Sequence, residues 1–252
     1  MKKSCLYLGL CGLTFFTQTA FAQPPEAELA LGIGLASFQD PQKGLDAKQV
    51  VLPLVSYRGE RLNFQVTTLS YKLVELGDVE INALVSGRIQ GYEAIDSPYL
   101  RGMKTRSDTL DGGISLDWNG FSLSYKHDLF SKYKGDEVAL SYSKGFDLGK
   151  LQLMTGAGVT WQSEKLNHYY FGVNTSEAQN LVVQGSLFNR THYQVEAALV
   201  PEVNALAIYS LSKSWALIGG AEVEFLPEEI TDSPIIGEKN SWGAFIGLAR
   251  NF

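Results

Sequence analysis

The sequence predicts an all-β protein, a transmembrane antiparallel up-and-down β-barrel of about 12 strands. Three observations support this fold class: an N-terminal export signal, long strands in which apolar and polar residues alternate, and a last strand that ends in Phe252. A sheet that spans a membrane has to close on itself, because its edges would otherwise carry unpaired backbone groups in lipid. The barrel is the sheet architecture that accommodates all three observations.

Residues 1–22 have the form of a secretory signal peptide. Two lysines form a positive region, residues 5–16 form an apolar region, and Ala20 and Ala22 place small residues at the two positions that a signal peptidase reads. The apolar region is shorter than the roughly 20 residues that a membrane-spanning helix needs. We therefore expect cleavage after Ala22 and a single mature domain, the barrel, over residues 23–252.

Composition excludes several classes of function. Both cysteines, Cys5 and Cys11, lie in the predicted signal, so the mature chain has no disulfide, thiolate nucleophile or cysteine metal site. Of the 21 basic residues, two lie in the signal, which leaves 19 against 27 acidic residues and a net charge of −8. Because no basic stripe is present, nucleic acid is not an expected partner.

Alternation with a period of two recurs along the mature chain. In the segment that begins at Phe121, apolar residues such as Leu123 and Tyr125 share one face, and Ser122 and Ser124 lie on the other. The pattern predicts eleven strands: 29–38, 49–58, 62–73, 78–90, 109–118, 120–130, 136–146, 150–162, 203–212, 214–226 and 241–252. A bacterial single-chain barrel has an even number of strands, so one is missing from this set. The candidate is 193–200, followed by a turn at Pro201 and Glu202, which gives 12 strands; ten is the alternative.

A soluble β-sandwich would show the same alternation. Two features favour the barrel. The predicted strands are about 10 to 13 residues long, enough to cross a bilayer at a tilt of about 45°, whereas strands average about 5–6 residues in soluble proteins. Their apolar faces also end in aromatic residues, as membrane interfaces require: Trp118, Phe121, Phe146, Trp161 and Trp215.

Turns and loops predict the orientation of the strands. Asn119-Gly120, residues 147–149 and residues 212–214 have the composition of tight periplasmic hairpins. Residues 163–192 are expected to form a long external loop. Residues 91–108 form a second long loop, whose side the sequence leaves open.

The last strand carries a specific signal. Trp242, Ala244, Ile246, Leu248 and Phe252 lie on one face, which only a snorkelling arginine at position 250 interrupts. This ending resembles the signal by which the outer-membrane assembly machinery recognises barrel precursors. We therefore expect the outer membrane of a Gram-negative bacterium as the location, with its lipid and that machinery as partners.

No catalytic, cofactor-binding or metal-binding residues are predicted. A Ser-His mechanism needs a serine and a histidine oriented by a third polar group. His127 shares the apolar face of its strand and is expected to face lipid near an interface. His168 and His192 lie in or beside the long loop, near the serines at 163, 176 and 186, but no spacing selects a triad.

The charged residues of the strands and loops fall into two groups, one expected to be solvated and one expected to line the barrel interior. Asp108, Asp111, Asp136 and Glu137 at strand ends, and Glu228, Glu229 and Asp232 in the last long loop, are interpreted as solvated rather than as a cation site. Polar residues expected to line the interior are Glu80, Arg88, Asp117, Glu222 and Glu224. A barrel of eight strands is filled by side chains, so ten to twelve strands leave room for a narrow lumen.

Several segments resemble the MipA/OmpV family of outer-membrane proteins. They are GVTWQSEKLNHYYFGV at 158–173, TDSP at 231–234, VLPLVSY at 51–57, YLRGMKTR at 99–106 and the closing GLARNF at 247–252. The resemblance covers essentially the whole mature chain, with a tyrosine common in the family where Phe171 stands here.

The resemblance implies an integral outer-membrane barrel without a catalytic motif or cofactor. In the best-known branch of the family, the barrel is a scaffold that joins a membrane-bound lytic transglycosylase to a bifunctional peptidoglycan synthase. A scaffold of this kind is therefore the leading hypothesis. A small channel for ions or solutes is the second, and a lipid-modifying barrel enzyme is the third.

Overall fold

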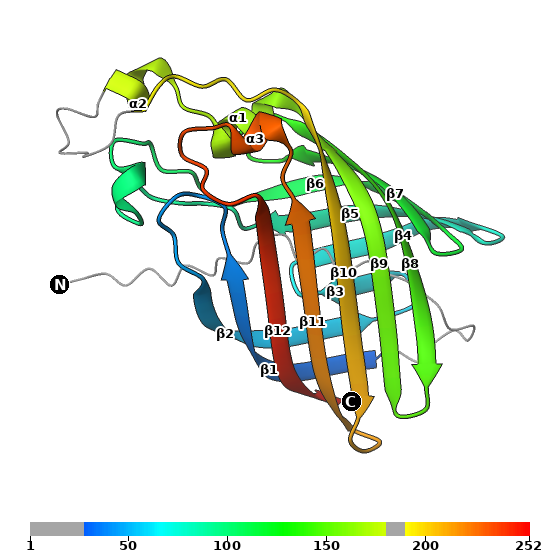
Figure 1. Cartoon of the computed structure of the whole chain (residues 1–252). Coiled ribbons are helices and arrows are strands. Elements are labelled where there is room, and N and C mark those ends of the chain that lie inside the picture. The colour runs from blue at the N-terminus through cyan, green and yellow to red at the C-terminus, as the bar shows by residue number, and fades with distance from the viewer. Residues whose placement is uncertain (1–27, 180–189) are drawn as a thin grey trace.

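The computed structural model describes residues 28–179 and 190–252, which form one closed β-barrel of 12 antiparallel strands (Figure 1). Strands that follow each other in the chain are neighbours in the sheet, and β1 pairs with β12 to close it. The strands are β1 (Glu28–Gln39), β2 (Lys48–Arg58), β3 (Leu62–Gln65), β4 (Thr68–Leu76), β5 (Val79–Arg88), β6 (Thr109–Trp118), β7 (Phe121–Asp128), β8 (Asp136–Leu148), β9 (Leu151–Gln162), β10 (Ala198–Ser210), β11 (Trp215–Phe225) and β12 (Asn240–Asn251). The predicted up-and-down barrel is confirmed, and the predicted signal peptide lies outside the described residues.

The two rims of the barrel differ. One rim carries short turns, and β12 ends there. The hairpins predicted at 119–120, 147–149 and 212–214 lie at this rim, with turns at 119–120, 149–150 and 211–214 in the structure. At the hairpin of Asn119 and Gly120, both residues have positive φ (45° and 91°), as a two-residue turn between twisted strands favours.

The other rim carries the long connections and all the helices (Figure 1). These helices are η1 (Pro98–Leu100), α1 (Glu164–Phe171), α2 (Thr175–Gln179) and α3 (Glu228–Thr231). Connection 89–108 lies at this rim together with residues 163–179 and 190–197, so the two long loops are on the same side of the barrel, which the sequence left open.

The outer wall is apolar and the interior is polar. On β7, Phe121, Leu123 and Tyr125 are exposed, whereas the alternating Lys126 and Asp128 are buried. The aromatic residues predicted at the rims, from Trp118 to Trp215, are all exposed on the outer wall. A soluble sandwich would bury these faces, so the arrangement confirms the membrane barrel.

Two strand predictions are wrong, although the total of 12 is right. The segment 62–73 is two strands, because a turn at Val66, with φ of 50°, divides β3 from β4. The run Val66-Thr67-Thr68 has high strand propensity, which hid the turn from sequence reasoning.

The second error lies in β10. Residues 193–200 are not a separate strand, and Pro201 and Glu202 continue β10 instead of turning. Pro201 pairs with Val159 of β9, while the β10–β11 ladder begins only at Glu202. A proline has no backbone N–H to donate, so it is tolerated in a strand at a position where one side of the strand has no hydrogen-bonded neighbour.

Most of the hydrophobic core lies in the long connections, and a smaller buried cluster with Ala36 and Leu52 lies on the inward faces of β1 and β2. The described parts of these connections, 40–47, 89–108, 129–135, 163–179, 190–197 and 226–239, which we call the cap, pack together over one mouth of the barrel. Its fully or almost fully buried members include Leu45, Leu100, Tyr133, Leu166, Tyr170, Val195 and Ile230. Full burial of each large apolar side chain stabilises the fold by about 1.5–3 kcal/mol, so these loops form one packed unit.

Candidate functional site

A polar cavity of about 120 Å³ lies in the lumen beneath the cap. It extends from Ser122, next to the short turn at the start of β7, to Gln162 at the cap end of β9. Seven of its 18 lining residues are serines or threonines, and Arg88 and Glu224 are among its charged residues. The alternation thus places all five predicted interior residues on the lumenal face, as expected.

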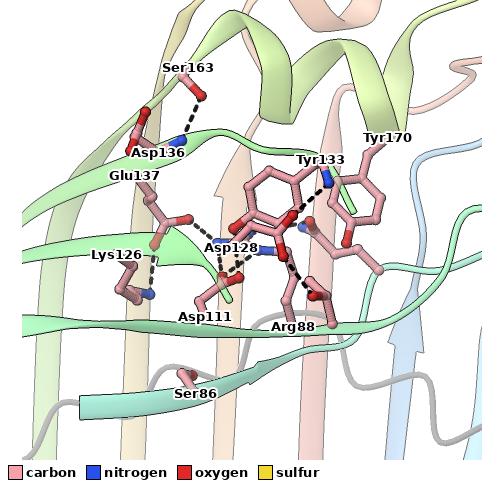
Figure 2. A network of polar contacts seen from close by, with 12 residues as sticks. Ser86, Arg88, Asp111, Lys126, Asp128, Tyr133, Asp136, Glu137, Ser163 and Tyr170 are labelled. Carbon is pink, nitrogen blue, oxygen red and sulfur yellow. Dashed lines mark hydrogen bonds and ion pairs between the residues drawn. The ribbon is translucent and has the colours of Figure 1, made fainter. Parts of the chain in front are cut away.

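An ion network crosses one side of the lumen, on four consecutive strands (Figure 2). Arg88 Nη2 lies 2.7 Å from Asp111 Oδ2 and 2.7 Å from Glu137 Oε2. Lys126 Nζ lies 2.6 Å from the other oxygen of Glu137. Buried charges are costly unless they are paired. In this network, two cations and two anions neutralise each other.

The interpretation of Asp111 and Glu137 as solvated carboxylates is therefore wrong. Asp111 is 2% exposed and Glu137 is 5% exposed. Both face inward because they alternate with outward residues of β6 and β8. Lys126, the second partner of Glu137, was not among the residues expected to line the interior, although its alternation with Tyr125 and His127 places it inward.

The ion network also anchors the cap. The Tyr133 hydroxyl donates to Asp111 Oδ1 at 2.6 Å, and its ring lies 5.5 Å from the Arg88 guanidinium. Asp128 accepts the backbone N–H groups of Tyr133 and Lys134 at 2.7 and 2.9 Å. Connection 129–135 is thereby tied to the lumenal charges (Figure 2).

A second buried pair holds the cap together. Glu177 of α2 is fully buried; it accepts the Lys104 N–H at 2.9 Å and pairs with Arg106 Nη2 at 2.9 Å. Burial by itself raises the pKa of the Glu177 carboxyl, but the N–H groups of Asn174 and Lys104 and the Arg106 guanidinium outweigh it and lower the pKa. Arg190 adds hydrogen bonds to the backbone carbonyls of connection 89–108. Sequence reasoning missed this pair, since its members lie 71 residues apart.

The three histidines lie in different surroundings. His127 is on the outer wall of β7, as predicted, with Nδ1 2.8 Å from Asp136 Oδ1. His168 is in α1, where Nε2 lies 3.2 Å from Asn174 Oδ1, and His192 is exposed before β10. Within residues 28–179 and 190–252, no serine hydroxyl bonds to any of these imidazoles; the serine at 186 lies outside that range.

The described carboxylates do not gather into a metal site. Glu228, Glu229 and Asp232 are exposed at α3, in agreement with the solvated interpretation. In the part of the chain that the structure describes, no group of three or more His, Cys, Asp or Glu residues is arranged to hold a metal ion. No described helix is long and apolar enough to cross a membrane.

Comparisons with known proteins agree with this architecture. Residues 31–252 match the model of the family described as MltA-interacting protein MipA. The putative outer membrane protein YiaT of Escherichia coli K12 is 26% identical over 95% of this chain and 97% of its own length. Outer membrane protein OmpV of Vibrio cholerae is 26% identical over 90% and 88%, and the MltA-interacting protein of Escherichia coli K12 is 24% identical over 90% of each chain. This chain, an outer-membrane β-barrel with a packed cap, thus belongs to the MltA-interacting protein MipA family, also known as the MipA/OmpV family.

Proposed function

We propose that this barrel is a non-enzymatic scaffold for peptidoglycan-remodelling enzymes at the outer membrane. The partners are a membrane-bound lytic transglycosylase and a bifunctional peptidoglycan synthase. The observation that carries the proposal is the match over 90% of the chain to relatives named MltA-interacting protein, in Escherichia coli and Shigella flexneri. The apolar cap supports it, because a barrel with one mouth packed shut is better suited to present surfaces than to pass solutes.

The short-turn rim is the surface on which such partners would dock. Short turns face the periplasm in barrels of this class, and peptidoglycan lies on that side. The rim exposes charged turn residues of both signs, among them Glu60, Asp78 and Lys213. A polar, mixed-charge surface suits partners that bind and release, because non-obligate interfaces are about as polar as the rest of a protein surface.

Site-specific photocrosslinking in intact cell envelopes tests the proposal. A photoreactive residue at Glu60, Asp78 or Lys213 should give adducts that contain a lytic transglycosylase or a peptidoglycan synthase. The matched control is Lys132, which is exposed in the cap at the opposite rim and should give neither. Adducts without any peptidoglycan enzyme at the three turn positions would reject the scaffold.

A small channel is the second candidate function. The cavity of about 120 Å³ and its hydroxyl lining favour it. Planar-bilayer recording of the purified barrel separates the two functions: steady open steps support the channel, and a silent membrane supports the scaffold.

A further inference from the structure

Three glutamates lie side by side on the lumenal face of β10 and β11, in the half of the barrel nearer the cap. Glu202 on β10 and Glu224 on β11 are direct cross-strand partners. Glu222 lies on the same face of β11, two residues from Glu224, and pairs in register with Asn204. Like charges directly opposite each other on neighbouring strands destabilise a sheet, so this arrangement needs a compensating interaction.

Other interior carboxylates have such an interaction. Asp111 and Glu137 pair with Arg88 and Lys126, and Glu80 pairs with Lys72 at 3.0 Å. Asp117 has no cationic partner but accepts hydrogen bonds from Asn82 and Ser115. Among the described residues, by contrast, no lysine, arginine or histidine forms an ion pair with Glu202, Glu222 or Glu224. The two cations of the lumen network are already engaged at 2.6–2.7 Å by the opposite wall.

Two buried acceptor atoms point to a donor from outside the chain. Glu222 is 4% exposed, and its Oε2 is buried without a hydrogen-bond partner. Gln162, a neutral side chain that lines the cavity, is also 4% exposed, and its Oε1 likewise has no partner. Asn204, which pairs in register with Glu222, has a buried Nδ2 that is likewise without a partner. Buried acceptors in folded proteins are almost always bonded, and Gln162 lines the cavity, so N–H groups of a solute there would satisfy its Oε1. Glu222 adds its carboxylate to the same wall without lining the cavity itself.

The cavity beside the glutamates provides space for that solute. Gly158 pairs in register with Glu202, and this position favours glycine, because a Cβ would lie 3.1 Å from Glu202 Oε1. Gly243 and Ser241, both small, flank Glu222 and Glu224 on β12. Glu202 and Glu224 line the same cavity as Gln162, and it continues downward to Ser122 beside the short-turn rim.

The geometry also selects the kind of cation. The described acidic residues do not converge as metal ligands. The three glutamates are instead distributed over β10 and β11, and the neutral acceptor Gln162 lies toward the cap. Separated acceptors of this kind match a chain of ammonium groups, each of which carries several N–H donors at a fixed spacing.

We propose that the lumen binds a small linear polyamine, an organic cation with two or more ammonium groups, on Glu202, Glu222 and Glu224. The solute enters from the short-turn rim, because the cap packs over the other mouth. This site is independent of the scaffold surface on that rim, since its residues face the interior.

Isothermal titration of the purified, detergent-solubilised protein with spermidine tests the proposal. Binding should saturate at one spermidine per barrel and weaken as sodium chloride is raised, because the attraction is electrostatic. The E202Q/E222Q/E224Q variant should bind at least about tenfold more weakly, because amides of the same shape cannot supply the charge. The matched control is E80Q, a lumenal glutamate that already has Lys72 as its partner, and its affinity should stay within about threefold of wild type.

Three results would overturn the proposal: no saturable binding by the wild type, equal binding of the dianion succinate, or unchanged binding by the triple variant. Displacement of spermidine by an equal concentration of magnesium chloride would overturn the assignment to an organic cation. Heat-modifiable gel migration reports whether each variant is folded. If the triple variant does not fold, E222Q alone removes the most buried carboxylate and should still weaken binding measurably; unchanged binding by a folded E222Q then counts against the proposal.

Discussion

Replacement of Arg88 by methionine tests whether the lumenal ion network stabilises the barrel. The change keeps much of the side-chain volume but leaves Asp111 and Glu137 without the guanidinium that lies 2.7 Å from each of them. Removal of one partner from a buried pair costs about 3–5 kcal/mol. Because Lys126 still pairs with Glu137 and Tyr133 still donates to Asp111, both at 2.6 Å, we expect the lower end, about 3 kcal/mol.

The assay is urea unfolding of the barrel in lipid vesicles, followed by tryptophan fluorescence. The matched control is Arg58→Met, which removes an exposed pair with a 3.9 Å separation from Glu28 and should cost less than about 1 kcal/mol. The double variant R88M/D111N should recover part of the loss, because Asp111 no longer leaves an uncompensated charge and Glu137 keeps Lys126 as its partner. A folded Arg88→Met barrel as stable as the Arg58→Met control would refute the assignment of stability to this network.

Three further predictions follow from other parts of the chain. Deletion of Phe252, whose backbone N–H bonds to β1 at 2.9 Å where the barrel closes, should reduce outer-membrane insertion, and its replacement by aspartate should do so because a charge then stands in place of an exposed apolar ring; normal membrane levels and heat-modifiability would count against this role. Replacement of His127, His168 and His192 together by glutamine should leave the phenotype of a deletion strain complemented, because glutamine keeps hydrogen bonds but cannot act as a general base; a folded variant without function would revive an enzymatic mechanism. The lowered pKa of Glu177 means that its contribution to stability is present above the carboxyl's unfolded pKa and is lost as pH falls through the folded value. Hydrogen exchange in 89–108 and 163–179 should therefore rise on acidification, and Glu177→Gln, which should cost about 1–3 kcal/mol, should flatten that response; an identical pH profile in the variant would exclude Glu177 as the cause.

The cap explains how a barrel with a mainly polar lumen obtains a large core. The wall of the cavity is mostly small and polar, and the inward apolar residues of β1 and β2, such as Ala36 and Leu52, form only a small cluster. The long connections supply most of the apolar burial instead, through residues such as Tyr170, Val173 and Ile235. Their attachment to Arg88 and Asp111 through Tyr133 couples the cap to the strands beneath it.

Local features of the sequence determined the architecture. The side-chain period of two assigns each strand residue to the lipid or to the lumen, and it placed Glu222, Glu224 and Arg88 inside correctly. Turn chemistry located the hairpin at Asn119-Gly120, where positive φ is required. These properties depend on neighbours in the chain, so they can be read without knowledge of the fold.

Pairing across the barrel was decided only by the tertiary structure. Whether Asp111 is solvated or bound to Arg88, and whether Glu202 stands beside Glu224 or in a turn, depends on strand register and on where each ladder begins. Register is set by closure of the whole sheet, and a shift of one residue would move every side chain to the other face. The contact of Glu177 with Arg106 depends in the same way on how separate loops pack over the mouth. The sequence alone therefore determined which residues face the lumen, and the closed sheet determined which of them meet.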